Sequence, residues 1–287
     1  MTIASQKLNS NATTALHGAH IQNNSDTLVI IFQGVFTKTN EAYATNIMEG
    51  RIPDKDVKNL HSYYHFMKIS ERNDTRDYLY LEDYYSRLYG WYAFDNGKFI
   101  YEELSDELSQ FIDAHGYKHV YVVGSSKGGV GAILMALHCP QIERVFTMVP
   151  DIRISTDGFG DSGRKLFFNE NEVFEKRVKT MFEKQDIFKR LEKRENKPKF
   201  FFFTGVRDYG FKPLTNLHQK LRKEYDVESH LLIMPTPEPH SPLIKNHPNL
   251  MNYLIQNMDK ERLWEDDEFT SVSPNAHIAT YKTIGMK

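Results

Sequence analysis

Apolar residues along this chain follow two patterns, which are short continuous runs and longer segments with helical periodicity. The continuous runs are typical of strands buried on both faces of a parallel sheet. We predict such strands at residues 27–32, 63–69, 77–81, 119–123, 144–149, 199–204 and 230–234. We predict helices at residues 101–115, 130–137, 174–188, 214–225 and 243–258. This alternation predicts an α/β fold, in which a mostly parallel central sheet carries helices on both faces.

The pattern favours one domain over residues 1–287, without an internal repeat or a low-complexity linker. Residues 151–198 depart from it, because a glycine-rich loop is followed by a charged segment of helical spacing. We interpret 151–198 as a helical lid inserted after a strand. Lys and Arg outnumber Asp and Glu there by ten to six over residues 172–199, so the lid has a basic face that is either solvated or directed at a polyanion. The terminal segments 1–26 and 262–287 show no clear element.

The most informative local motif is a turn between the strand at 119–123 and the helix that follows. It reads Gly124-Ser125-Ser126-Lys127-Gly128, a G-x-S-x-G sequence in strand–turn–helix context. This is the nucleophile elbow of α/β-hydrolases, in which a strained turn exposes the hydroxyl of Ser126. Gly124 and Gly128 leave room for the tight turn. A phosphate loop would need its lysine after the glycines, and a purely structural glycine turn is the other alternative.

Two backbone N–H groups are candidates for an oxyanion hole. One belongs to Lys127, directly after Ser126 at the start of the helix. The other belongs to Val35 or Phe36, which follow Gly34 at the end of the strand at 27–32. An ordinary strand-end glycine explains Gly34 equally well. For an oxyanion hole, we expect the N–H groups of Lys127 and Val35 to be the two donors, with Phe36 as the alternative to Val35.

The acid and the histidine that would complete a catalytic triad follow Ser126 in the order expected for this fold. Asp208 comes after the strand at 199–204, and His240 comes after the strand at 230–234. Both lie where parallel strands present ligands, at their carboxyl ends. The rivals are Asp151 for the acid, and His247 and His230 for the base. We expect no metal site, because no metal-binding spacing of His and Cys occurs.

Charge and composition exclude some partners. The formal net charge of −2 gives no reason to expect nucleic acid or an anionic membrane as a partner. No segment has the length and hydropathy of a membrane span, and the N-terminal residues lack a signal peptide. The single cysteine, Cys139, suits a reducing compartment. We expect a cytoplasmic protein, with peripheral attachment to the inner membrane through a partner left open.

The aromatic residues of segment 78–94 allow two interpretations. Tyr84, Tyr85, Tyr89, Trp91 and Tyr92 all fall within it. They form either a strand followed by a loop that covers the core, or a platform on which sugar rings stack. Stacking of nucleic-acid bases is disfavoured, because basic residues are not concentrated there.

The elbow sequence Gly124-Ser125-Ser126-Lys127-Gly128-Gly129-Val130-Gly131-Ala132 resembles that of bacterial α/β-hydrolase-type capsule polysaccharide O-acetyltransferases. The positions of Asp208 and His240 match a late Asp and a final His of that family. Glu238-Pro239-His240-Ser241 departs from its glycine-flanked histidine. The resemblance implies an α/β-hydrolase-like fold. It also implies transfer of an acetyl group from acetyl-CoA to a hydroxyl of a cell-surface polysaccharide, through an acetyl-Ser126 intermediate.

Three hypotheses about function remain after the sequence analysis. The first is a serine-dependent polysaccharide O-acetyltransferase with acetyl-CoA as co-substrate and no permanently bound cofactor. The second is a serine esterase or other acyl hydrolase on the same scaffold. The third is a non-catalytic polysaccharide-assembly protein that kept the fold. The order of Ser126, Asp208 and His240 argues against the third.

Overall fold

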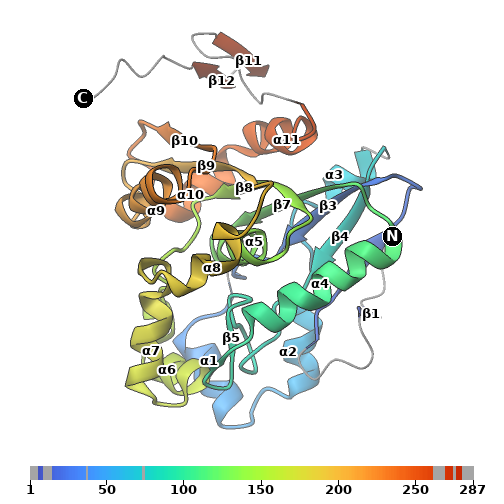
Figure 1. Ribbon diagram of the computed structural model, residues 1–287. Coiled ribbons are helices and arrows are strands. Elements are labelled where there is room, and N and C mark those ends of the chain that lie inside the picture. The colour runs from blue at the N-terminus through green and yellow to red at the C-terminus, as the bar shows by residue number, and fades with distance from the viewer. Residues whose placement is uncertain are drawn as a thin grey trace.

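A computed structural model describes residues 6–8, 15–36, 38–72, 75–260, 269–273 and 276–279. Within these residues, eight strands form one sheet in the order β1-β2-β4-β3-β7-β8-β9-β10 (Figure 1). The strands of this sheet are β1 (Gln6–Lys7), β2 (His17–Ile21), β3 (Thr27–Phe32), β4 (Asp77–Leu81), β7 (His119–Ser125), β8 (Ile142–Met148), β9 (Lys199–Gly205) and β10 (Ser229–Met234). The six strands from β4 to β10 run parallel, and β1 and β2 add an antiparallel edge.

Two small hairpins lie outside this sheet, β5 (Phe94–Asp95) with β6 (Lys98–Phe99), and β11 (Phe269–Ser273) with β12 (Ala276–Ala279). Residues 1–5 and 9–14 of segment 1–26, and most of segment 262–287, lie outside the described residues. Where segment 1–26 is described, it forms the antiparallel edge of the sheet.

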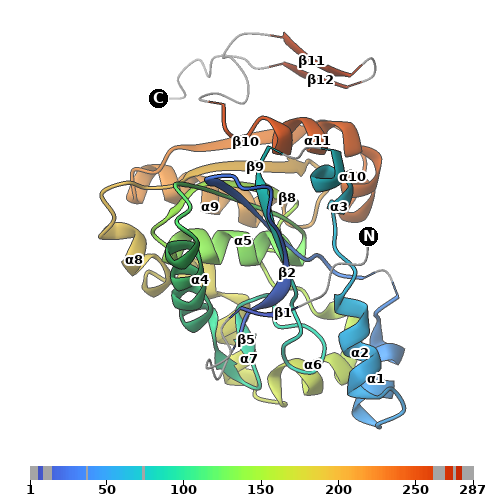
Figure 2. The ribbon, with the colours of Figure 1, turned by 90° about the vertical axis from the view of Figure 1, so that its right-hand side faces the viewer.

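Helices cover both faces of the sheet (Figures 1 and 2). The helices are α1 (Glu41–Met48), α2 (Asp54–His61), α3 (Met67–Arg72), α4 (Tyr101–His115), α5 (Lys127–His138), α6 (Gly160–Phe168), α7 (Glu172–Lys179), α8 (Lys189–Glu192), α9 (Phe211–Glu224), α10 (His240–Asn246) and α11 (Pro248–Gln256). Apolar side chains of α4, α5 and α9 pack on one face, and those of α10 and α11 pack on the other. The predicted α/β-hydrolase-like architecture is therefore present.

Most of the predicted strands and helices are confirmed. The burial of their side chains follows directly from the pattern of apolar residues along the chain. The side chains of β3, β4 and β9 are almost wholly buried, as continuous apolar runs require. Helix α4 spans the predicted residues 101–115 and ends at Gly116, whose φ of 71° makes the expected left-handed cap.

The prediction of a strand at 63–69 is wrong. The chain turns there, with Phe66 at a φ of 59°, and then enters α3. A positive φ cannot continue an extended strand. Tyr64 is nevertheless buried, and its hydroxyl donates to Glu82 Oε1 over 2.7 Å. Tyr64 therefore packs in the core without pairing in the sheet, whereas the neighbouring Tyr63 is exposed.

Two predicted helices are broken into shorter pieces. The segment 174–188 holds the end of α7 and the 3-10 turns η2 (Met181–Glu183) and η3 (Asp186–Phe188) instead of one helix. The predicted closing helix at 243–258 divides into α10 and α11 at His247. Pro248 opens α11, because proline lacks the N–H that a helix interior requires but is accepted at its first position.

Residues 151–198 connect β8 to β9 and contain the 3-10 turn η1 (Asp157–Phe159), α6, α7, η2, η3 and α8. Helix α6 packs against α1, where the hydroxyls of Thr45 and Ser162 lie 2.6 Å apart. The interpretation of this segment as a lid stays a prediction.

The aromatic segment 78–94 packs inside the protein. Tyr85, Tyr89, Trp91, Tyr92 and Phe94 are all buried in the core. This supports the interpretation as a core-covering loop over that of a sugar platform. Cys139 is buried too, and burial raises the pKa of its thiol to about 12, which disfavours the nucleophilic thiolate.

Across the described part of the chain, no helix combines the length and the apolar character that crossing a membrane demands.

We predict that buried histidines destabilise the protein in acid. Burial lowers the pKa of His61 to about 3 and that of His138 to about 4. Between about pH 6.5 and pH 4 the unfolded chain binds protons at these positions that the folded chain does not. The free energy of unfolding should therefore fall as the pH is lowered through this window, as measured by urea denaturation.

A His138→Leu variant tests the cause. It should lose about 1–3 kcal/mol less stability than the wild type between about pH 7 and pH 4.5. An identical pH dependence in both proteins would contradict the explanation.

Candidate active site

Ser126 stands in a sharp turn between β7 and α5. Its backbone has φ 51° and ψ −121°, a strained conformation for a residue with a side chain. The turn is possible because its neighbours lack side chains. A Cβ at Gly124 would lie 2.1 Å from the Gly128 carbonyl oxygen, and one at Gly128 would lie 2.5 Å from that of Phe32. The local geometry is that of the elbow predicted from sequence.

Three side chains from distant parts of the chain meet at this turn. His240 Nε2 lies 2.8 Å from Ser126 Oγ, and His240 Nδ1 lies 2.9 Å from Asp208 Oδ1. Asp208 follows β9, and His240 is the first residue of α10 after β10. All three lie at the carboxyl edge of the parallel strands, as the sequence order predicts. The spacing allows a proton to pass from the serine hydroxyl to an imidazole whose other nitrogen is held by a carboxylate.

The surroundings of Asp208 favour its ionised form. Burial by itself raises the pKa of this carboxyl group, whose side chain is 0% exposed. Hydrogen bonds from His240, from the Gly210 N–H and from the Thr204 hydroxyl outweigh burial and hold the pKa below its usual value. Asp208 is therefore a carboxylate at neutral pH, able to orient the imidazole and to stabilise its protonated form.

The rival residues have other partners. Asp151 is buried near His240, but its Oδ2 accepts from Trp91 Nε1 over 3.3 Å and from the Ser155 N–H over 2.9 Å. Burial raises its pKa to about 6. His247 pairs with Glu238 over 2.7 Å, and His230 lies 3.0 Å from Glu228. The geometry thus favours Asp208 and His240 over these alternatives.

The two candidate oxyanion donors are unoccupied within the described chain. Gly34 N–H donates to His65 Nδ1, and Phe36 N–H donates to the Tyr89 hydroxyl, each over 3.0 Å. The intervening Val35 N–H and the Lys127 N–H at the start of α5 have no acceptor among these residues. This favours Val35 over Phe36 as the second donor.

The side chain of Lys127 makes a contact that sequence analysis did not predict. Its ammonium group lies 2.5 Å from Asp83 Oδ2, and both side chains are 0% exposed. The rings of Tyr89 and Tyr92 lie 4.5 and 5.3 Å from the same nitrogen. Asp83 Oδ1 also accepts the N–H groups of Gly90 and Tyr92. The sequence did contain a signal for this contact, which was the acid Asp83 within an aromatic run. A charge that is buried among apolar residues needs a partner.

Burial raises the pKa of Asp83 and lowers that of Lys127. The mutual attraction, the two backbone donors and the two aromatic faces oppose this effect and favour the ion pair. The pair ties the first residue of α5 to the loop that follows β4.

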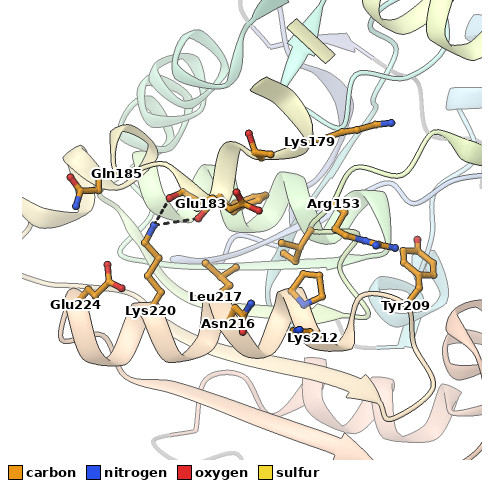
Figure 3. A pocket seen from close by; sticks show the side chains of 14 residues that line it. Arg153, Lys179, Glu183, Gln185, Tyr209, Lys212, Asn216, Leu217, Lys220 and Glu224 are labelled. Carbon is orange, nitrogen blue, oxygen red and sulfur yellow. Dashed lines mark hydrogen bonds between the residues drawn. The ribbon is translucent and has the colours of Figure 1, made fainter. Parts of the chain in front are cut away.

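One cavity is lined by triad residues, and a second lies on the other side of Tyr209, which stacks on His240. A cleft of about 490 Å³ is lined by Ser126, His240, Val35 and His65, among others. A second cavity, of about 730 Å³, lies between α9 and the η2 region (Figure 3). Tyr209 lines this second cavity, and its ring stacks on that of His240 with 4.5 Å between centroids. The two spaces therefore approach each other across a pair of stacked rings.

Among the residues that the structure describes, no group of three or more His, Cys, Asp or Glu side chains could hold a metal ion.

Solved structures similar in fold to this chain include esterases and an acetyltransferase. The capsule O-acetyltransferase of Neisseria meningitidis serogroup A is 13% identical, with a TM-score of 0.56, 88% of this chain covered and 98% of that one. The esterase Est22 is 10% identical with a TM-score of 0.56, and covers 89% of this chain and 78% of its own. The Pyrococcus furiosus esterase Pf2001 is 18% identical with a TM-score of 0.50, and the match covers 91% and 93%.

These similarities, together with the strand order, show that the chain has an α/β-hydrolase-like fold. No model of a known protein family matches the chain, and no curated protein matches it significantly in sequence. At such low identity the solved structures show the fold alone.

We predict that Asp83 and Lys127 stabilise the protein only as a pair. Asp83→Asn keeps an acceptor for the Gly90 and Tyr92 N–H groups but leaves the Lys127 charge buried and unpaired. It should cost about 3–5 kcal/mol in free energy of unfolding, and Lys127→Met should cost a similar amount. The double variant should be clearly more stable than the sum of the two losses implies, as measured by denaturant unfolding. Strictly additive losses would show that the two side chains do not depend on each other.

Proposed function

We propose that this protein is an enzyme that transfers acyl groups through an ester on Ser126. The observation that carries the proposal is the continuous chain of contacts from Ser126 Oγ to His240 Nε2 and from His240 Nδ1 to Asp208, at 2.8 and 2.9 Å. It is supported by the N–H groups of Lys127 and Val35, which have no acceptor within the described chain. Lys127 directly follows Ser126, and Val35 lines the same cleft. A serine hydroxyl is a weak nucleophile at neutral pH and needs such a base.

The reaction follows from these positions. Ser126 Oγ attacks the acyl carbonyl carbon while His240 Nε2 takes the hydroxyl proton. Asp208 stabilises the resulting imidazolium. The N–H groups of Lys127 and Val35 bind the oxyanion, and a donor of this kind contributes about 3–4 kcal/mol in a well-studied case. The intermediate collapses as His240 returns the proton to the leaving group, which departs and leaves an acyl-Ser126 ester.

A second nucleophile then removes the acyl group. Its hydroxyl loses a proton to His240, attacks the ester carbonyl and displaces Ser126 Oγ, which recovers that proton. We propose acetyl-CoA as the donor and a hydroxyl of a capsular or other cell-surface polysaccharide as the acceptor. The elbow sequence supports this, as does the fold shared with a capsule O-acetyltransferase. Use of acetyl-CoA entails that the enzyme works inside the cell, with attachment to capsule-assembly partners as the accompanying hypothesis.

The second cavity supports an acceptor larger than water. The buried apolar side chains of Ile152, Phe182 and Leu217 are part of its lining. Charged and polar side chains line it as well, Lys220 and Asn216 among them (Figure 3). Its volume of about 730 Å³ is within the range of small-molecule sites. We propose that the acyl group occupies the Ser126 cleft and that the acceptor extends into this cavity.

The alternative function is ester hydrolysis, with water as the second nucleophile. The esterases that share the fold favour it. The triad is the same in both cases, so the distinction depends on whether the acceptor site excludes water. A non-catalytic role has no comparable support, because a polar chain of three residues would then serve no chemistry.

We predict that acetyl-CoA, or an activated acetyl ester, acetylates Ser126. Under single-turnover conditions the peptide containing Ser126 should gain the mass of one acetyl group. Ser126→Ala should abolish both the mass increase and turnover. Ser125→Ala is the matched control, since its hydroxyl is one residue away in β7, and it should still be acetylated at Ser126. Turnover that persists in Ser126→Ala would reject the mechanism.

We predict that filling the second cavity separates transfer from hydrolysis. Asn216→Trp should raise the KM for an oligosaccharide acceptor by about tenfold or more, because the indole occupies its space. Cleavage of a small acetyl ester should change by less than about threefold, because the triad is untouched. Gln219→Trp, on an exposed position of the same helix, should leave both activities unchanged. Equal behaviour of the two tryptophan variants toward the acceptor would place the acceptor elsewhere.

A further inference from the structure

His65 is a second imidazole in the cleft that contains Ser126 and His240. It belongs to the turn before α3, in the stretch wrongly predicted to be a strand. Its Nδ1 lies 3.0 Å from the Gly34 nitrogen, whose N–H it accepts. Gly34 directly precedes Val35, one of the two candidate oxyanion donors. The ring therefore lines the same cleft as Ser126 and the candidate donor Val35.

The contact with Gly34 determines which ring nitrogen carries the proton. A backbone N–H can only donate, so Nδ1 must present its lone pair. In a neutral imidazole the proton then resides on Nε2. Burial, and secondly the nearby charge of Lys127, lower the pKa of His65 to about 4. The ring is accordingly a neutral donor through Nε2 at physiological pH.

The surroundings leave that donor available for a ligand. The rings nearest to His65 are those of Phe36, Tyr63 and Phe66, at 5.8 to 6.4 Å between centroids. Within the described chain, Nε2 has no acceptor. The neighbouring His61 differs, because it is fully buried and its Nδ1 is 2.9 Å from Gln33 Oε1. His61 is thus part of the core, whereas His65 is half-buried and lines the cleft.

We propose, on the basis of the acyl transfer proposed above, that His65 donates a hydrogen bond from Nε2 to the acyl oxygen of the substrate. It acts together with the N–H groups of Val35 and Lys127. The bond strengthens as that oxygen gains negative charge, so it contributes mainly to the transition state. A neutral imidazole can act in this way without changing the charge of the site, as a histidine does in triosephosphate isomerase. The same ring accepts the Gly34 N–H and so orients the Gly34–Val35 segment.

Two amide variants separate donation from orientation. His65→Asn places an amide oxygen near the position of Nδ1, so it can still accept from Gly34 but has no group at the position of Nε2. His65→Gln reaches the Nε2 position with an amide N–H₂. With p-nitrophenyl acetate, we expect His65→Asn to lose kcat by about 10²-fold, the size of a missing oxyanion donor, with KM changed by less than about threefold. His65→Gln should retain at least about ten times the kcat of His65→Asn.

Three kinetic outcomes would contradict the donor role. A wild-type kcat in His65→Asn would mean that the ring only orients the turn. Equal losses in the two variants, or an increase in KM alone, would also overturn it. Failure of the underlying function is distinguishable, because the wild type would then form no acyl-Ser126.

Nitrogen NMR of histidine-labelled protein gives a readout independent of activity, with the His65 signal assigned through His65→Asn. It should show a neutral ring protonated on Nε2 from about pH 6 to pH 8, and protonation on Nδ1 would reject the proposal.

Discussion

Lys127 carries its charge into the interior of the protein, where the ammonium group meets the carboxylate of Asp83 at 2.5 Å. Lys127 follows Ser126 directly and begins α5, and Asp83 begins the buried aromatic loop after β4. Removing two charges from water is costly, so this pair forms only when the loop, its backbone donors and the elbow are all in place. The ion pair thereby couples the strained conformation of Ser126 to the packing of the core.

The remainder of the site is assembled by the parallel sheet. Asp208 and His240 come from loops after β9 and β10, far from Ser126 in sequence but at the same edge of the sheet. Asp151 reaches the neighbourhood as well, yet Trp91 and the Ser155 N–H engage it. The position of a carboxylate after a strand is thus insufficient to assign its role. The assignment of the triad acid depends on the imidazole nitrogen that the carboxylate contacts and on the distance between the two atoms.

Predictions from the sequence succeeded where a local pattern had one physical explanation. Continuous apolar runs became β3, β4, β7, β8, β9 and β10. The predictions were wrong where more than one local structure is compatible with the same sequence pattern. The apolar residues at 63–69 and the helical spacing at 174–188 indicate that side chains are buried. Turns and 3-10 segments can bury side chains as well as a strand or a long helix can.

The sequence by itself determined the α/β alternation, the elbow around Ser126, and the order in which Asp208 and His240 follow it. These features depend on neighbours along the chain and on the steric needs of a glycine-flanked turn. Only the tertiary structure decided that Asp208 rather than Asp151 holds His240, that Asp83 receives Lys127, and that His65 is turned toward the cleft. Such pairings join residues distant in sequence, and their strength depends on burial and on ångström-scale distances that no linear pattern encodes.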